Sequence, residues 1–584
     1  MPRLTPQQAI SLAARAMEAG GLDRAEGLCR RILEAHADQA QALHLLGLIA
    51  HRRGRAEDAL GLLRRSIELA PEVADFHSNL GTVLAGGSRM DEATACFRRA
   101  TELDPRHASA WSNLGTALER SGLLEDAVAA HRRAIELCPD NTDALRNLAV
   151  CLEKLARPEE AVDVYRRAIR LRPDATTHSG LLYCLHYLPQ TTPEMIFEES
   201  VAWARLHAPP LPPPAAIHEP DVHRRLRVGY LSHAFRRSPQ CVFAEPVLRY
   251  HDTDSYAVYL YGDVTRPDAV TERVRGFGHT WRDIVGLGNQ QVAELVRRDR
   301  IDILVDLAGH TPSTRLGVFA ARAAPLQVAW IAYPSTTGLH AIDYRITDSV
   351  VDPPGSERYY TEELVRLDQP FLCYRPAEEA PEVGPLPADH AGYITFGCLN
   401  RPNKINPLLV EVWSRVLQTV PASRLLLLSH AQGPAPIQAM FARHGVTSSQ
   451  LEFLPRTGHR AYMEAFNRVD LHLDPYPYNG HTTTCDGLWM GVPIVSWAGQ
   501  TAVSRLGLCL LGAIGLGDLV AQDAQQYIAK AVTLAQDRCR LRMLRGQLRQ
   551  RMVSSVLCDA PRFTRALEGA YRALWARRCA QACG

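Results

Sequence analysis

The sequence predicts an α-helical repeat array followed by two domains in which parallel β-strands alternate with α-helices. Three observations predict this fold class. Proline, alanine and Leu-Gly positions typical of a helical repeat recur through the first third of the chain, and a proline-rich segment follows them. After that segment come two successive series of short apolar strands with helical segments between them. At 584 residues the chain is long enough for two or three domains.

The first third of the chain repeats every 34 residues. A proline recurs at this step in four copies, an alanine in five and a Leu-Gly pair in three. The prolines are Pro71, Pro105, Pro139 and Pro173, and the alanines are Ala25, Ala59, Ala93, Ala127 and Ala161. Small residues allow paired helices to approach closely, and proline ends the second helix. A helix-turn-helix unit of this length predicts about five tetratricopeptide repeats over residues 6–175, an α-solenoid.

Three asparagines share the same step. Asn79, Asn113 and Asn147 each precede the leucine of that pair or of its counterpart in the next repeat, so they are expected to form a row along the array. A row of amides can hold the backbone of an acceptor protein, independent of its side chains. Polar residues tolerated on an exposed helix face are the alternative. Arrays of this kind can also dimerise, so a homodimer through the repeats is a further expectation.

Residues 176–224 are predicted to be a helical connector that ends in the proline-rich "PPLPPPAAIHEP". A first Rossmann-like lobe is predicted over 225–385, with strands such as "RLRVGYLS", "YAVYLYG" and "IDILVDLAGH". A second is predicted over 386–584, with "YITFGCLN", "SRLLLLS", "VDLHLDP" and "VPIVSW", followed by C-terminal helices. Two such lobes side by side form the GT-B plan of glycosyltransferases, which sugar-nucleotide epimerases share. Ligands in such sheets lie beyond the carboxyl ends of the strands.

The composition argues against several classes of protein. A net charge of +2 gives no overall attraction to nucleic acid. No segment approaches the roughly 18 apolar residues of a membrane helix, and "MPRLTPQQAI" shows no secretory signal. The fourteen cysteines are scattered, as free thiols in a reducing compartment would be, so we expect a cytoplasmic protein. No metal site is predicted, because the DxD form "HDTDSY" precedes a strand and is expected to be a turn.

Polar residues crowd the start of a predicted helix in "YPYNGHTTTCDGLWMG". His481, Thr482 and Thr483 fall in its first turn, where free N–H groups and the helix dipole favour an anion such as phosphate. Asp486, further along, is placed to accept hydrogen bonds from ribose hydroxyls. An ordinary capped helix is the alternative, although one cap needs only one hydroxyl.

A second candidate site lies in "FGCLNRPNKINP", again where a strand opens into a helix. Lys404 is one of only three lysines among 65 basic residues, and Arg401 precedes it. An ammonium there can pair with a diphosphate as charge builds on it; a solvated surface lysine is the alternative. In the first lobe, Asp306 and His310 follow a strand, and they are the candidates for the catalytic base.

These stretches, together with "AAPLQVAWIAYPSTTGLHAIDYRITD" and the repeat array, resemble the nucleocytoplasmic protein O-glycosyltransferase family. That family holds the O-linked N-acetylglucosamine transferases and the SPINDLY O-fucosyltransferases. The resemblance implies an inverting, metal-independent and cofactor-free transfer of one sugar to Ser or Thr of intracellular proteins. By motif position, Lys404, His481, Thr482 and Thr483 would bind the donor diphosphate. Asp486 would bind the ribose, and the three asparagines would match the family's acceptor-binding ladder.

The donor stays open between UDP-GlcNAc and GDP-fucose. "DYRITDSVVDPPG" and "ALEGAYRALW" are most similar to SPINDLY, whereas "NGHTT" is the form of the GlcNAc transferases. The chain also departs from the family, because Ser238 stands where a histidine usually lies near the catalytic-base position, and His233 lies five residues earlier. Two other hypotheses therefore stay open: a catalytically weak or inactive repeat scaffold that binds nucleotide-sugar, and a GT-B enzyme that acts on a glycan.

Overall fold

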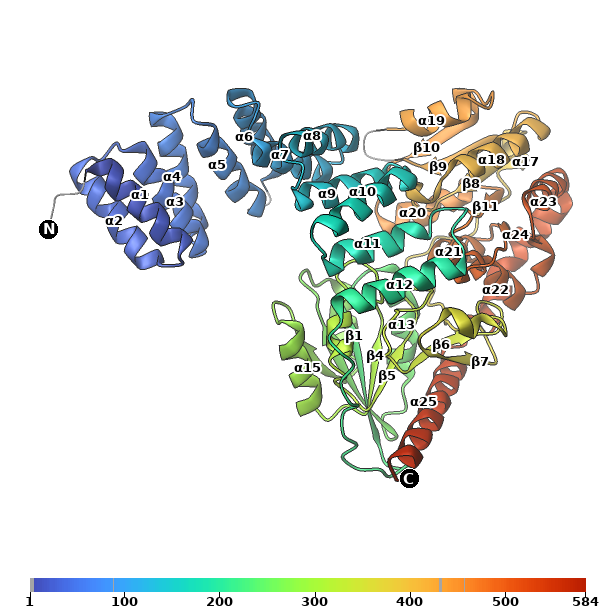
Figure 1. Cartoon of the computed structure of the whole chain (residues 1–584). Helices are drawn as coiled ribbons and strands as arrows, with labels where there is room; N and C mark the ends of the chain where they lie inside the picture. Colours follow the sequence, from blue (N-terminus) through green and yellow to red (C-terminus); the bar gives the residue numbers. More distant parts are fainter. Residues whose placement is uncertain (1–4, 88, 430–432, 456, 584) are drawn as a thin grey trace. The chain divides into compact units, whose positions relative to one another are not determined.

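The computed structural model describes residues 5–87, 89–429, 433–455 and 457–583. The chain forms two compact units, one up to Leu155 and one from Ala156 onward. The first unit is entirely helical in its described part, and the second contains both β-sheets (Figure 1).

The first unit is built from consecutive helix pairs. Its helices are α1 (Pro6–Glu18), α2 (Leu22–Ala35), α3 (Ala40–Arg52), α4 (Ala56–Leu69), α5 (Ala74–Gly86), α6 (Met90–Leu103), α7 (Ala108–Arg120), α8 (Leu124–Leu137) and α9 (Thr142–Lys154). The glycine that recurs every 34 residues allows the two helices of a pair to pack closely. A Cβ on Gly81 would lie 2.7 Å from the ring of Phe97 on the paired helix. Gly115 approaches His131 equally closely. Only a residue without a side chain lets the two helices meet there.

Three more helices open the second unit: α10 (Pro158–Leu171), α11 (Ala175–Leu185) and α12 (Pro193–His207). The division between the compact units therefore falls inside the predicted repeat range, before α10. Helix α12 packs tightly on the following domain, because a Cβ on Gly338, whose φ is +73°, would lie 2.2 Å from the carbonyl oxygen of Ser200. Leu182 and Trp203 of α11 and α12 share a hydrophobic core with strands of the first sheet.

The first sheet has seven parallel strands in the order β3-β2-β1-β4-β5-β6-β7. The strands are β1 (Leu226–Ser232), β2 (Tyr256–Gly262), β3 (Thr280–Asp283), β4 (Ile303–Asp306), β5 (Leu326–Ala329), β6 (Tyr344–Asp348) and β7 (Glu363–Leu367). Its helices are α13 (Pro239–Tyr250), α14 (Ala269–Arg275), α15 (Asn289–Arg298), α16 (Leu316–Ala320) and the 3-10 turn η1 (Ser356–Tyr359). The sequence did not predict β3, β6 and β7, whose charged side chains interrupt the apolar pattern.

The second sheet has six parallel strands in the order β10-β9-β8-β11-β12-β13. They are β8 (Thr395–Cys398), β9 (Arg424–Leu428), β10 (Leu451–Leu454), β11 (Leu471–Leu473), β12 (Ile494–Trp497) and β13 (Val520–Ala521). The helices are α17 (Ala388–Ala391), α18 (Pro407–Thr419), α19 (Ala435–Ala442), α20 (His459–Ala465), α21 (Thr482–Trp489), α22 (Leu506–Ala513), α23 (Ala524–Gln536) and α24 (Arg538–Val553). The 3-10 turns are η2 (Pro402–Lys404), η3 (Ser448–Gln450), η4 (Phe466–Arg468), η5 (Ala502–Ser504) and η6 (Gly517–Leu519).

Both sheets have the Rossmann strand order, which reverses once within each sheet. The predicted fold class, a helical array followed by a GT-B type pair of Rossmann-like lobes, is confirmed. We call the loops after β1 and β4 (residues 233–238 and 307–310) the first switch point. The loops after β8 and β11 (residues 399–406 and 474–481) are the second switch point. Ligands of open α/β sheets bind at such points.

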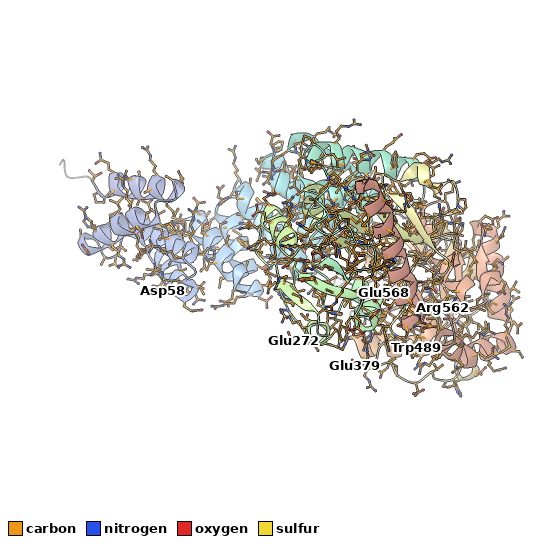
Figure 2. All side chains as sticks on the ribbon, turned by 90° about the horizontal axis from the view of Figure 1, so that it is seen from below. Asp58, Glu272, Glu379, Trp489, Arg562 and Glu568 are labelled. Atoms are coloured by element: carbon orange, nitrogen blue, oxygen red, sulfur yellow. The ribbon has the colours of Figure 1, made fainter. Side chains whose placement is uncertain are left out.

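The last helix, α25 (Ala560–Cys583), returns to the first lobe, although it follows the second in the chain (Figure 1). It contacts α13, β5 and β7. Glu568 on this helix, labelled in Figure 2, accepts hydrogen bonds from His251 Nδ1 at 2.8 Å and from the backbone N–H of Asp252 at 2.9 Å. The C-terminal helices predicted with the second lobe are thus divided between the two lobes. None of the described helices is long and apolar enough to cross a membrane.

Candidate functional site

The second switch point holds Lys404 close to the loop that precedes α21. Its ammonium donates to the carbonyl oxygen of Asn479 at 2.7 Å and to Oδ1 of Asn400 at 3.2 Å. It also lies 4.3 Å from the ring centroid of Tyr478. These partners are all neutral, so they orient the ammonium without cancelling its charge.

A buried carboxylate shapes the same loop. Asp474 is fully buried, and its oxygens accept from the backbone N–H of Gly480 at 2.7 Å and from Oγ of Ser496 at 2.6 Å. Gly480 has no room for a side chain, because a Cβ there would lie 2.3 Å from Oγ1 of Thr484. Burial lowers the pKa of Lys404 to about 8, and the charge of Asp474 opposes that shift. Asp474 therefore holds the loop in place and favours the charged form of Lys404.

Helix α21 begins beside this lysine, as the sequence predicted. His481 is its N-cap residue and makes no side-chain capping bond, and its ring stacks on Phe243 at 4.2 Å between centroids. The Nε2 atom of His481 and the Oγ1 atom of Thr482 are buried without a hydrogen-bond partner within the described ranges. Burial lowers the pKa of His481 to about 3, so the ring is neutral near pH 7. Two unsatisfied polar atoms at a helix N-terminus beside an ammonium suit an anionic ligand.

Asp486 lies one turn further into α21, and it already has protein partners. Its carboxylate accepts from Oη of Tyr374 at 2.7 Å, and Tyr462 also hydrogen bonds to it. Burial raises the pKa of Asp486 to about 7. A ribose hydroxyl would have to share this acceptor with the two phenols. Thr483, in the first turn of α21, hydrogen bonds to Tyr462 on α20, so the two helices are joined there.

Arg401 is exposed at the N-cap of η2, three residues before Lys404. Its charge adds to the effect of burial in lowering the pKa of Lys404, so the two cations are near each other. Arg401 therefore increases the positive potential of the second switch point from its solvent side.

At the first switch point the two candidate bases are occupied by the protein itself. Asp306 is 1% exposed, and its oxygens accept from the backbone N–H groups of Ala308 at 2.9 Å and Gly309 at 2.8 Å. Burial raises its pKa to about 6. This carboxylate fixes the turn after β4, so its geometry does not support the predicted catalytic role.

His310 is also 1% exposed, and both of its ring nitrogens are used. Nδ1 lies 3.0 Å from Oγ of Ser179, and Nε2 lies 2.9 Å from the carbonyl oxygen of Thr337. The carbonyl requires the proton on Nε2, so Nδ1 accepts from the serine. Burial lowers the pKa of His310 to about 3. The ring has no free lone pair, which argues against the predicted role as a base.

Ser238 caps helix α13, because its Oγ accepts from the backbone N–H of Cys241 at 3.2 Å and donates to the carbonyl oxygen of Ala234 at 2.9 Å. His233 differs from the other polar side chains of this loop. It is half-buried, and its Nδ1 has no hydrogen-bond partner among the residues that the structure describes. Burial lowers its pKa, which favours the neutral ring, and a neutral ring with an unpartnered nitrogen can accept a proton.

The three asparagines of the repeat array are all half-buried. The amide nitrogen of Asn79 lies 3.0 Å from Nε2 of His44 on the preceding repeat, and that of Asn147 donates to Oγ1 of Thr116 at 3.2 Å. These contacts orient the amides of Asn79 and Asn147. A side-chain amide also has a second N–H and a carbonyl oxygen, which are further hydrogen-bonding groups.

Within the described residues, no group of three or more His, Cys, Asp or Glu side chains could hold a metal ion. The DxD stretch is a turn in which Asp252 accepts from the backbone N–H groups of Asp254 and Ser255.

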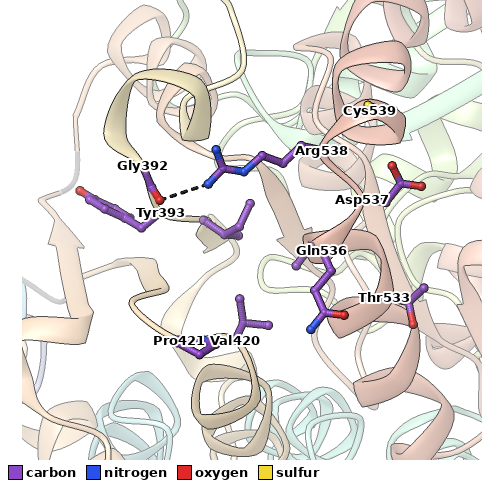
Figure 3. Close-up of a pocket in the computed structure, with 11 residues that line it drawn as sticks. Gly392, Tyr393, Val420, Pro421, Thr533, Gln536, Asp537, Arg538 and Cys539 are labelled. Carbon is purple, nitrogen blue, oxygen red and sulfur yellow. Dashed lines mark hydrogen bonds between the residues drawn. The ribbon is translucent and has the colours of Figure 1, made fainter.

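A surface hollow of about 650 Å³ lies elsewhere, lined by Tyr393, Val420, Thr533 and Arg538 among others. Arg538 donates across it to the carbonyl oxygen of Gly392 at 3.1 Å (Figure 3). Neither switch point contributes to this hollow.

Sequence reasoning missed the residues that hold Lys404 in place. Asp474 lies at the carboxyl end of the predicted strand "VDLHLDP", a position that is typical of ligand-site residues in such sheets. Asn400 lies in the quoted lysine motif, and Asn479 lies directly before the glycine of the helix motif. Tyr478 and its neighbours on α11 carried no signal, because their contacts join segments far apart in the chain.

The comparisons with known proteins agree with this architecture. A model of glycosyl transferase family 41 matches residues 199–375 and 384–567, and tetratricopeptide repeat models match residues 11–74, 74–107 and 106–174. A relative from Oryza sativa subsp. japonica, named probable UDP-N-acetylglucosamine–peptide N-acetylglucosaminyltransferase SPINDLY, is 41% identical over 408 residues. The match covers 68% of this chain and 44% of the relative.

A similarly named relative from Arabidopsis thaliana, SEC, is 29% identical over 394 residues, which cover 65% of this chain and 40% of the relative. The chain thus spans less than half the length of these curated relatives. A solved structure of a mutant of the Thermobaculum terrenum O-GlcNAc transferase is 34% identical. It has a TM-score of 0.71 and covers 99% of this chain and 98% of that one. The family model matches more than half of the sequence, so the chain belongs to glycosyl transferase family 41.

Proposed function

We propose that this chain is a protein O-glycosyltransferase that moves one sugar from a nucleotide-sugar donor to Ser or Thr hydroxyls of proteins. One observation carries the proposal. At the second switch point, the Lys404 ammonium donates to the carbonyl oxygen of Asn479, two residues before His481. His481 Nε2 and Thr482 Oγ1, at the start of α21, have no hydrogen-bond partner among the described residues. The relatives are named as probable peptide N-acetylglucosaminyltransferases, which supports the same reaction class.

In the proposed reaction the donor diphosphate lies between Lys404 and the first turn of α21. The acceptor oxygen attacks the anomeric carbon from the side opposite the diphosphate, so the configuration inverts. The bond from that carbon to the diphosphate breaks and its electron pair leaves with the diphosphate, while the proton of the acceptor hydroxyl passes to His233 or to water. Negative charge grows on the leaving diphosphate, where Lys404 and the helix N–H groups stabilise it. A fixed ammonium supplies the charge that a divalent metal would otherwise bring, so we propose a reaction without metal or cofactor.

Two donors fit the proposal. The names of the relatives refer to UDP-N-acetylglucosamine, and the neighbouring structure is an O-GlcNAc transferase. The resemblance of "DYRITDSVVDPPG" to SPINDLY favours GDP-fucose instead. Both donors present the same diphosphate to Lys404. The choice between them depends on the sugar and the base.

The acceptor protein is proposed to bind along the asparagine row of the repeat array. Tetratricopeptide arrays bind extended segments of other proteins on their concave face. A cytoplasmic location and a homodimer remain predictions from the sequence.

A second candidate function, a repeat scaffold that binds nucleotide-sugar with weak or no turnover, is favoured by the first switch point. Asp306, His310 and Ser238 all make hydrogen bonds within the protein, and the first two are 1% exposed. His233 is the exception, because its Nδ1 has no partner within the described part of the chain. Loss of a base slows such reactions by about 10²–10⁴-fold without abolishing them.

One experiment separates these functions. The purified chain is incubated with UDP-GlcNAc or GDP-fucose and a host lysate, and modified proteins are identified by mass spectrometry. Sugar on Ser or Thr with one donor, absent with a Lys404→Met variant, is the expected result. Nucleotide binding without modification by either donor would support the scaffold. A modified glycan with unmodified proteins would establish a glycan-directed enzyme instead.

A further inference from the structure

The turn after helix α11 contacts the second lobe beside Lys404. Tyr187, in this turn, is 2% exposed, and its Oη lies 3.0 Å from Nδ2 of Asn403, which donates to it. Asn403 is the residue directly before Lys404. A segment that the sequence assigned to a connector thus reaches the lysine motif of the second lobe, 216 positions along the chain.

The same tyrosine also supports Lys404 from the other side. The ring of Tyr187 stacks on that of Tyr478, with centroids 5.5 Å apart and planes 27° apart. Tyr478 in turn carries the Lys404 ammonium over its face at 4.3 Å. The hydroxyls of Tyr478 and Tyr183 lie 3.3 Å apart, so helix α11 itself adds a second contact to this ring. Tyr187 therefore touches both the residue before Lys404 and the ring beneath its ammonium.

Helix α11 is itself fixed to the first lobe. Nε2 of His186 lies 3.0 Å from Oη of Tyr333, and Ser179 is bonded to His310 at 3.0 Å. The backbone of α12 lies directly against Gly338. Because these contacts are buried, the turn that carries Tyr187 is a rigid support between the two lobes.

We infer that Tyr187 is a positioning residue for Lys404, holding the ammonium where the donor diphosphate binds. The inference rests on the proposed function, since it assigns to Tyr187 a role in that same diphosphate site. A lysine side chain is long and flexible, and its ammonium is a point charge without the fixed geometry of a guanidinium. Asn403 is fixed to Tyr187 directly before Lys404, and the ammonium lies over the Tyr478 ring, on which Tyr187 stacks. With these supports Lys404 loses less freedom when the diphosphate binds, which favours binding.

Binding of UDP and of GDP, measured by isothermal titration calorimetry, tests the inference. Tyr187→Phe removes the bond from Asn403 but keeps the ring, and Tyr187→Leu removes both. Loss of one hydrogen bond predicts an affinity about 3–10-fold lower for Tyr187→Phe, with a larger loss for Tyr187→Leu. Tyr333→Phe is the matched control. It also removes a buried hydroxyl that holds the α11 segment, but this hydroxyl bonds His186 and not Asn403. Thermal unfolding of each variant measures stability separately.

A double-mutant cycle distinguishes positioning from general stability. If Tyr187 acts through Lys404, Tyr187→Phe causes no further loss of affinity in the Lys404→Met background. Equal losses in both backgrounds, or the same loss in Tyr333→Phe, would overturn the inference. If Lys404→Met leaves the binding of both nucleotides unchanged, the proposed donor site fails. If Lys404→Met weakens binding while Tyr187→Phe binds like the wild type, only the role of Tyr187 fails.

Discussion

The loops after β1 and β4 and the loops after β8 and β11 occupy the same topological position in two sheets of the same strand order. Both contain polar residues of the kinds that bind ligands or move protons. At the first switch point, Asp306 accepts two backbone bonds and both nitrogens of His310 are bonded. At the second, the Lys404 charge is unneutralised by direct contact, and two polar atoms of α21 have no partner in the described part of the chain.

The difference supports the proposal that the second switch point binds the ligand and that the first is formed by structural turns. Buried polar atoms are normally satisfied within a protein, so unsatisfied ones beside a positive charge are candidates for bonds to an anionic ligand. Residue type and position alone predicted both regions equally well. His233 is an exception at the first switch point, because its Nδ1 has no hydrogen-bond partner among the residues that the structure describes.

The largest expected effect tests the second switch point directly. Lys404→Met removes the charge that stabilises the leaving diphosphate, so we expect turnover to fall by about 10²–10³-fold. Sugar transfer to protein, followed by mass spectrometry or with a labelled donor, measures it. Lys530→Met is the matched control, because this lysine lies on α23 and donates to the carbonyl oxygen of Asp518. Equal activity of the two variants would show that Lys404 does not stabilise the diphosphate, and the second switch point would lose its proposed role.

The next prediction concerns the exception at the first switch point. If His233 accepts the proton of the acceptor hydroxyl, His233→Gln lowers kcat by about 10²-fold and leaves nucleotide affinity unchanged. Initial rates at saturating donor and calorimetric binding of the nucleotide measure the two quantities. An unchanged kcat would mean that the polar groups of the first switch point are all structural.

The repeat array is expected to act independently of both switch points. Replacing Asn79, Asn113 and Asn147 together with alanine removes three amide groups, so we expect modification of protein substrates to fall about tenfold or more. Nucleotide affinity should not change. The measurement compares transfer to proteins with calorimetric binding of UDP and GDP. Full protein modification by the triple variant would reject the asparagine ladder.

A smaller effect follows from the ionisation of Lys404. Burial lowers its pKa to about 8, so the free ammonium loses its proton as pH rises through that value. Nucleotide affinity should therefore fall by about tenfold between pH 7 and pH 9, since only the charged form attracts the diphosphate. Calorimetry across this range measures the change, and Lys404→Met should show no such dependence. An affinity that rises with pH would contradict the assignment.

The smallest effect on turnover is expected at Asp306. Asp306→Asn replaces one of two accepting oxygens with a donor, which leaves a buried N–H group without its bond. We expect a loss of stability of about 1–3 kcal/mol, with kcat unchanged for the folded protein. Thermal unfolding and initial rates measure the two effects, and Asp368→Asn at an exposed position is the control. A large fall in kcat without loss of stability would restore Asp306 as a catalytic residue.

Much of the fold was predictable from the sequence because it depends on local patterns. The 34-residue step predicted the helix pairs, and the repeated glycine lies directly against a side chain of the partner helix. The apolar runs predicted β1, β2, β4 and β5, whereas β3 and β7 carry exposed charged residues and gave no such pattern. The return of α25 to the first lobe could not be predicted, because it depends on contacts such as that of Glu568 with His251, 317 positions apart in the chain.

The candidate site was predictable only in part. Helix α21 and Lys404 were both predicted to bind the diphosphate, and they lie together because their strands, β8 and β11, are neighbours in the sheet. The proposed role of Tyr187 could not be predicted, because it depends on a hydrogen bond to Asn403 across 216 positions of the chain.

By itself, the sequence determined the helical array, the two parallel sheets and the residue types at the ends of their strands. These features follow from periodicity and from short-range preferences, which are written locally in the chain. Only the tertiary structure decided which of the polar residues are satisfied by the protein and which are left for a ligand. The bond between Ser179 and His310 joins residues 131 positions apart, and no local pattern records such a partner.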